Sequence, residues 1–203
     1  SPLVNILPSY GLYVFDAEII NTHGGSIRVY CSTSERTLSE NAKDILYEES
    51  NFISKYVGSS DLIETFYDTV KSRLNSLSNS INKYANDGIL LWGYTAPAKA
   101  TTLLSGLTEE ARNNISFIID DAPLKQNKYL PGTSIPIIGK NLNSLDSHFK
   151  SEHQVRNRYS TNSIGIIFSW NIATSLQKNL IKERMGSGKF LVPLPQPNEI
   201  NLF

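Results

Sequence analysis

Short apolar segments alternate with helix-forming segments over residues 89–203, and this alternation restricts the possible fold more than any other feature of the chain. Each apolar segment is almost continuously hydrophobic, which is typical of strands buried on both faces. The expected strands are residues 89–92, 115–119, 135–138, 163–168 and 189–192, and the expected helices are residues 98–104 and 173–184. The pattern predicts an α/β fold with a Rossmann-like parallel sheet and helices on both faces.

The first 88 residues have a different pattern. Residues 11–20 and 26–31 are rich in β-branched and aromatic residues, and the turn-forming segment 21–25 separates them. Residues 37–86 have helical spacing. We therefore expect a β-pair and a helical hairpin ahead of the sheet, all within one domain: a lead-in at 1–36, helices at 37–87 and the α/β part at 88–203.

The second expected helix carries an apolar stripe with a repeat of three to four residues. Its members are Leu62, Phe66, Val70, Leu74, Leu77, Ile81 and Tyr84. We expect this stripe to face the rest of the domain.

Charge and cysteine content exclude several classes of protein. Lys and Arg total 19, Asp and Glu total 19, and the net charge is zero, so nucleic acid is not an expected partner. No segment approaches about 18 uninterrupted apolar residues, so we expect no membrane span. Cys31 is the only cysteine, which excludes an internal disulfide or a thiolate zinc site and fits the cytoplasm.

The turn at residues 93–99 follows a buried strand and opens a helix, which is where open α/β sheets bind ligands. Gly93 favours a tight turn, and Pro97 suits the first turn of a helix. The free amides there, together with Lys99, suit a phosphate. An ordinary strand-to-helix turn with a solvated lysine explains the pattern equally well.

Two further groups have both a functional and an ordinary interpretation. Asp120 and Asp121 follow the second strand, where an acid can bind ribose hydroxyls or simply cap a turn. His23 lies in a glycine-containing turn and is followed by Ser26 and Arg28, which offer donors to a polar ligand. A surface hydrogen-bonding histidine is the alternative.

Several segments, taken in order, resemble the C-terminal domain of nucleotide-sugar C-methyltransferases. They are Thr22–Tyr30, Gly93–Lys99, Ile119–Gln126, Leu130–Ile137, Phe168–Asn171 and Gly188–Pro195. The chain departs from the family pattern at Thr95 and Ser187, where the family has glycine, and at Ser169, where it has proline.

The resemblance implies a three-part enzyme. A zinc-binding N-terminal domain and a middle domain that binds S-adenosylmethionine would precede this chain, and the middle domain would hold the catalytic Glu-His pair. No catalytic residue and no metal ligand are then expected here, and the chain alone should be inactive. Its partners would be a nucleotide-diphosphate sugar and the enzyme's own middle domain. The expected substrate-binding residues are His23, Gly24, Gly25, Ser26, Arg28, Gly93, Tyr94, Pro97, Ala98 and Lys99.

Two other interpretations stay open on the sequence alone. One is a free-standing Rossmann-like nucleotide-binding domain, for example of an oxidoreductase, although a single glycine at position 93 argues against tight NAD binding. The other is an assembly module in which the helix at 60–85 mediates the interaction.

Overall fold

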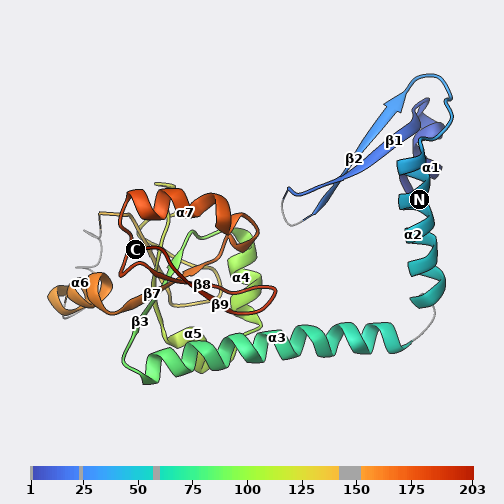
Figure 1. Ribbon diagram of the computed structural model, residues 1–203. Coiled ribbons are helices and arrows are strands. Elements are labelled where there is room, and N and C mark those ends of the chain that lie inside the picture. Colours follow the sequence, from blue (N-terminus) through green and yellow to red (C-terminus); the bar gives the residue numbers. More distant parts are fainter. Residues whose placement is uncertain (1, 23–24, 57–59, 142–151) are drawn as a thin grey trace. The chain divides into compact units, whose positions relative to one another are not determined.

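The computed structural model describes residues 2–22, 25–56, 60–141 and 152–203 (Figure 1). Contacts divide the chain into two compact units, Ser1–Asp68 and Thr69–Phe203. The boundary between them falls inside the long helix α3 (Ser60–Asn86).

The first unit is an antiparallel β-ribbon with a helix attached to it. Its elements are α1 (Pro2–Ile6), the short 3₁₀ helix η1 (Leu7–Tyr10), β1 (Tyr13–Ile20), β2 (Ser26–Ser32) and α2 (Glu40–Tyr56). A bulge lies in β1 between Val14 and Asp16. The amide of Ser39 donates to the carbonyl of Phe15 (2.8 Å), which holds the start of α2 against β1. The expected β-pair is confirmed.

The second unit is built on a seven-stranded sheet. Its strands are β3 (Leu90–Tyr94), β4 (Ile115–Ile119), β5 (Lys128–Tyr129), β6 (Pro136–Ile138), β7 (Ser163–Ile167), β8 (Lys189–Val192) and β9 (Asn198–Asn201). They lie in the order β5-β6-β4-β3-β7-β8-β9. The five central strands are parallel, and short antiparallel strands form both edges.

The strand order reverses once, and the reversal defines where a ligand would bind. The chain runs outward from β3 through β4 to β6, and then returns to place β7 on the other side of β3. The switch point is therefore between β3 and β7, and the crevice outside their carboxyl ends is the position where doubly wound sheets bind ligands.

Helices cover both faces of this sheet, as expected for an α/β fold with buried parallel strands. They are α4 (Ala98–Ser105), α5 (Glu109–Asn113), α6 (Glu152–Thr161) and α7 (Ala173–Lys182), with the 3₁₀ helix η3 (Trp170–Ile172) before α7. Alternate strand residues enter two separate cores. Leu91 packs with α3, α4 and α5 on one face, and Leu90 and Trp92 pack with α6 and α7 on the other. The predicted fold class is confirmed.

The apolar stripe of α3 meets the core over only half of its length. Leu77 and Ile81 are buried, with 1% and 0% of their surface exposed, whereas Phe66 and Val70 are 68% and 37% exposed. The expectation that Phe66 and Val70 face the rest of the domain is wrong, and the side chain of Leu62 lies outside the described residues. A helix of 27 residues is about 40 Å long, whereas a five-residue strand spans about 17 Å, so a strand of this sheet can match only part of the length of α3.

Candidate functional site

The site begins with Gly93 in β3, where packing excludes any side chain. A Cβ at this position would lie 2.4 Å from Cε2 of Phe168 and 2.8 Å from Cγ1 of Ile118. The glycine allows β3 to pass close to the phenylalanine that follows β7. Gly93 is not among the residues with positive φ, so its role is close packing rather than the tight turn that the sequence suggested.

Thr95 makes the turn itself. Its φ of 66° lies in the left-handed region, which a β-branched residue rarely adopts. The conformation is held from both neighbouring strands. The amide of Thr95 donates to the carbonyl of Ile119 (2.8 Å), and its hydroxyl lies 2.8 Å from the hydroxyl of Ser169. This pair of hydroxyls bridges the switch point between β3 and β7.

Asp120 fixes the other side of the turn. Its carboxylate accepts hydrogen bonds from the amides of Ala96 (2.7 Å) and Ala122 (2.9 Å), and Lys125 Nζ lies 3.1 Å away. Lys125 also donates to the carbonyl of Ala96 (3.0 Å). Burial alone would raise the pKa of Asp120, but these hydrogen bonds and the Lys125 charge outweigh it and lower the pKa. Of the two interpretations of Asp120, the structure supports the turn cap.

The first turn of α4 keeps two amides available. Among the described residues, the amides of Ala98 and Lys99 have no hydrogen-bond acceptor, whereas the amide of Ala100 donates to the carbonyl of Pro97. The side chain of Ala98 is exposed. These amides point outward at the positive end of the helix dipole, which is a favourable position for an anion.

Lys99 leans from α4 towards the segment that follows β7. Its ammonium donates to Oδ1 of Asn171 and lies 5.1 Å from the centre of the Trp170 ring. Asn171 does not cap α7, because the N-cap residue of that helix is Ile172, which makes no side-chain cap. Asn171 instead holds Lys99 beside the switch point, so a positive charge stands next to the two available amides.

A cavity of about 260 Å³ opens on the other side of the α4 N-terminus. Its walls come from α4, from the segment after β4 and from β5 and β6. The lining residues are Ala96, Pro97, Ala98, Thr101, Leu124, Lys125, Lys128, Tyr129, Leu130, Pro131 and Ile137. Sequence reasoning missed Lys128 and Tyr129, because a two-residue edge strand is too short to show a periodic pattern.

Tyr94, although expected to bind substrate, does not lie with the residues at the start of α4. Its ring is 4% exposed and belongs to the core on the α6 and α7 face, opposite α4. Burial raises the pKa of its hydroxyl. The alternation of side chains along β3 sends Gly93 to one face of the sheet and Tyr94 to the other.

The expected site residues of the ribbon lie in the first unit. Ser26 Oγ donates to the carbonyl of Thr22 (3.0 Å), and Arg28 pairs with Glu18 at 2.7 Å. Gly25 has a φ of 119° and completes the turn between the strands. His23 and Gly24 lie outside the described residues. A common site for these residues and the 93–99 turn remains a prediction.

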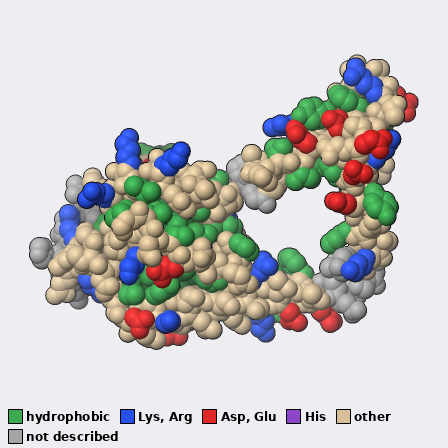
Figure 2. All heavy atoms as spheres, viewed as in Figure 1, with side chains coloured by type: hydrophobic (Ala, Val, Ile, Leu, Met, Phe, Trp, Pro, Cys, Tyr) green, Lys and Arg blue, Asp and Glu red, His purple; other side chains and the backbone are tan. Residues whose placement is uncertain are grey.

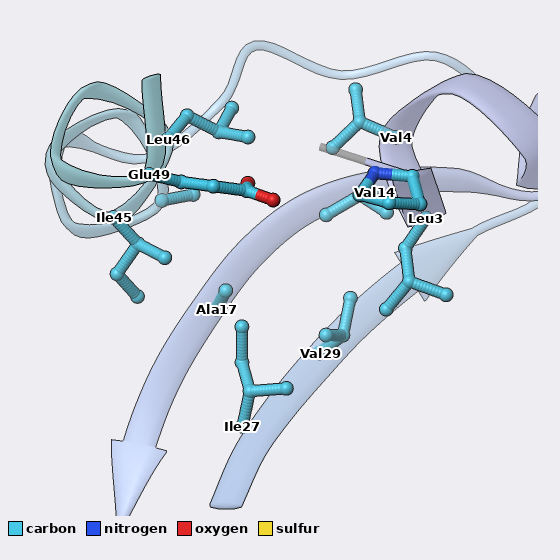
Figure 3. A pocket seen from close by; sticks show the side chains of 11 residues that line it. Leu3, Val4, Val14, Ala17, Ile27, Val29, Ile45, Leu46 and Glu49 are labelled. Carbon is cyan, nitrogen blue, oxygen red and sulfur yellow. The ribbon is translucent and has the colours of Figure 1, made fainter. Parts of the chain in front are cut away.

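The first unit has an apolar cavity of its own, of about 360 Å³, between α1, α2 and the ribbon (Figure 3). Figure 3 shows Val14, Ala17 and Leu46 on its walls and the Glu49 carboxylate pointing into it. Among the described residues that line it, Glu49 alone is charged. The other lining side chains are apolar and offer no hydrogen-bond donor to a phosphate, so this cavity does not suit a nucleotide.

No cluster of three or more His, Cys, Asp or Glu residues suitable for a metal was found among the described residues. Within the same part of the chain, no helix combines the length and the apolar composition needed to cross a membrane.

Fold and site together define the second unit as a Rossmann-like domain whose anion-favouring helix terminus lies at the switch point of the sheet. Residues 21–195 match the model of the family described as the C-methyltransferase C-terminal domain. The chain belongs to this family, as the sequence resemblance indicated. It is also 28% identical, over 206 residues, to C-methyltransferase NovU from Streptomyces niveus. That match covers 98% of this chain and 44% of NovU, so the chain spans less than half of this relative.

Proposed function

We propose that this chain is the nucleotide-sugar-binding domain of an S-adenosylmethionine-dependent sugar C-methyltransferase. The observation that carries the proposal is the pair of available amides, at Ala98 and Lys99, beside the switch point of a sheet from this family. A diphosphate offers oxygen acceptors for both amides. Lys99 is held beside them by Asn171 and supplies a compensating charge.

The neighbouring cavity would take an uncharged part of the ligand. Its lining includes Pro97, Pro131 and Ile137, together with Lys128 from β5. A ribose or a base placed there would lie next to a diphosphate at the start of α4. The apolar lining residues favour an uncharged group, and the lysine keeps the surroundings favourable for a negative charge.

The expected reaction is methyl transfer to a sugar carbon beside a ketone. A base removes the proton from that carbon, and the resulting enolate attacks the methyl group. The sequence has no match to the family's Glu-His base or to an acidic glycine-rich loop for the methyl donor. We therefore assign substrate binding and orientation to this chain, and place the base, the donor site and the zinc site upstream. Cys31 is exposed and forms no disulfide within the chain, and we propose the cytoplasm as the location.

The oxidoreductase alternative is disfavoured by two contacts. Asp120 is occupied by the amides of Ala96 and Ala122, so its carboxylate is not directed at a ribose. Thr95 holds the left-handed position in the turn, where a glycine would let a dinucleotide approach the backbone closely.

The test is binding of a nucleoside diphosphate, measured by calorimetry, to the chain and to two variants. Ala98→Pro removes one of the two available amides without changing charge. Pro97 already has an extended backbone (φ −75°, ψ 162°), and proline suits the first position of a helix, so α4 should persist. We expect Ala98→Pro and Lys99→Ala each to weaken binding by roughly 1–3 kcal/mol, the range for a charge-assisted hydrogen bond.

The matched control is Lys189→Ala, which removes the same charge at the start of β8, at the amino edge of the sheet. Lys125→Ala is unsuitable as a control, because Lys125 holds the turn through Asp120 and Ala96. Unchanged binding in both Ala98→Pro and Lys99→Ala would reject the helix terminus as the site. Equal losses in Lys99→Ala and Lys189→Ala would show a diffuse charge effect.

A further inference from the structure

Two hydroxyl groups meet at the switch point of the seven-stranded sheet. Thr95 Oγ1, in the turn after β3, lies 2.8 Å from Ser169 Oγ, which follows β7. Within the described part of the chain, this contact is the only hydrogen bond of either hydroxyl. Both residues are half-buried, so neither is sealed inside the core. We refer to Thr95 and Ser169 as the hydroxyl pair.

Local backbone preferences do not account for the hydroxyl pair. Ser169 occupies the N-cap position of η3, where a serine commonly accepts from a helix amide, yet its side chain makes no cap hydrogen bond. Thr95 has a φ of 66°, and strained positions of this kind cluster where proteins bind ligands. The chain also departs from the family pattern at both residues, so the structure joins two departures that lie 74 positions apart.

The hydroxyl pair keeps hydrogen-bonding capacity for a ligand. One proton lies between the two oxygens, and whichever residue donates it, the other residue keeps its own proton. The oxygens also keep lone pairs. The pair can therefore both donate and accept while carrying no charge. A sugar hydroxyl, which also donates and accepts, matches this chemistry better than a phosphate, whose oxygens attract charged donors.

The hydroxyl pair and the 260 Å³ cavity lie on opposite sides of β3 at the same edge of the sheet. The cavity is lined from β5 and β6, beyond β4, whereas the pair joins the β3 turn to the segment after β7. The start of α4 borders both regions, because Ala98 lines the cavity and Lys99 contacts Asn171, after β7. A ligand with its nucleoside in the cavity and its diphosphate at α4 therefore directs its sugar towards the pair.

We propose that Thr95 and Ser169 determine sugar specificity by hydrogen bonding, as a pair, to one oxygen of the sugar. The proposal rests on the proposed function, which places the nucleotide at the start of α4. The proton that the pair retains is donated to a hydroxyl or keto oxygen of the sugar. A sugar without an oxygen at this point covers the pair and leaves its donor unsatisfied, which lowers affinity.

The charge of the second unit separates this contact from binding of the diphosphate. The sequence of the unit, residues 69–203, contains fifteen Lys and Arg but nine Asp and Glu. Figure 2 shows Lys and Arg side chains spread over the visible face of this unit. Such a charge attracts a diphosphate in a salt-dependent way, whereas a contact between neutral hydroxyls is insensitive to salt.

The experiment is calorimetry of the 203-residue chain with uridine, thymidine and guanosine diphosphates, followed by the glucose conjugate of the best binder. The measured quantity is the sugar ratio, which is the Kd of the diphosphate divided by the Kd of its glucose conjugate. We expect a ratio of roughly three to ten in the wild-type chain, the range for one neutral hydrogen bond, at low and at high salt.

Two variants remove the hydroxyl pair and should bring the sugar ratio close to one. Ser169→Ala deletes one hydroxyl, and Thr95→Gly deletes the other with a residue that adopts the left-handed turn without strain. The Kd of the diphosphate alone should stay unchanged in both. Ser169→Thr keeps a hydroxyl and should keep the ratio. The matched control is Ser105→Ala, at the far end of α4, where the hydroxyl donates to the carbonyl of Thr102.

The outcomes separate this proposal from the proposed function. A chain that binds the diphosphate but has a ratio of one, or a ratio that Ser169→Ala and Thr95→Gly leave unchanged, would overturn the sugar contact alone. Equal weakening of both ligands in these variants would also overturn it, because the pair would then act on the diphosphate or on the shape of the turn. A chain that binds none of the diphosphates would overturn both proposals.

Discussion

Replacing Asp120 by asparagine tests the contact that holds the candidate site. The substitution keeps Oδ1, which accepts from the Ala122 amide, but places an amide nitrogen where Oδ2 accepts from Ala96 and Lys125. A hydrogen bond to a charged group contributes about 1.5–3 kcal/mol net. The ion pair with Lys125 contributes less to stability than the Ala96 hydrogen bond, because the Lys125 side chain is 42% exposed and solvent screens its charge. We therefore expect a loss of about 2–4 kcal/mol at pH 7.

Urea unfolding followed by tryptophan fluorescence measures this loss. Both tryptophans, Trp92 and Trp170, belong to the second unit, so the signal reports the unit that contains Asp120. With a denaturant slope of about 2 kcal/mol/M, the midpoint should fall by about 1–2 M.

The control is Asp121→Asn, which removes the neighbouring charge. The Asp121 carboxyl is 65% exposed, so the cost should stay below about 1 kcal/mol. Equal stabilities of the two variants at pH 7 would refute the reasoning.

The effect of Asp120→Asn should also depend on pH. The pKa of Asp120 is lowered in the folded chain, so its ionised form stabilises the fold above the unfolded pKa of about 4. This contribution is lost as the pH falls through the lower, folded value. The stability difference between the wild-type chain and Asp120→Asn should therefore be complete at pH 7 and should decrease below about pH 4.

Two further predictions use the same fluorescence assay. Leu77→Ala should destabilise the second unit by about 2–5 kcal/mol, because it leaves a cavity in the core, whereas Phe66→Ala should change stability by less than about 0.5 kcal/mol. Equal costs would show that the division of the α3 stripe is wrong. Gly93→Ala should cost about 1–3 kcal/mol or more, since the added methyl group overlaps Phe168 and Ile118; a neutral result would contradict the close packing of β3.

The fold could be predicted where the physical pattern was strong and local. The spans 115–119 and 189–192 coincide with β4 and β8, because continuous apolar runs bounded by polar residues identify buried strands. The helix α6 (Glu152–Thr161) was missed because the stretch is almost wholly polar. Of its described side chains, Tyr159 and Val155 pack against the core. Two-residue β5 gives no periodic signal at all.

Within the site, the position of the turn was predictable and its internal contacts were not. The strand-to-helix transition identified residues 93–99, and the structure places them at the switch point. The contact between Thr95 and Ser169 joins residues 74 positions apart, and the Lys99–Asn171 contact joins residues 72 apart. Local sequence patterns do not predict contacts between residues so far apart in the chain. The contacts of Lys125 with Asp120 and Ala96 depend likewise on the path of the segment after β4, which the sequence does not reveal.

The edges of the two sheets differ in their expected tendency to add foreign strands. The seven-stranded sheet ends in β5 and β9, which have two and four residues, so each edge exposes few unpaired backbone groups. The β1–β2 ribbon has eight and seven residues per strand, and neither outer edge is paired within the described chain. Ile19 and Ile27 are exposed on it. Long, open, partly apolar edges are templates for intermolecular β-pairing, so aggregation of this chain should begin at the ribbon and leave the Rossmann-like unit folded.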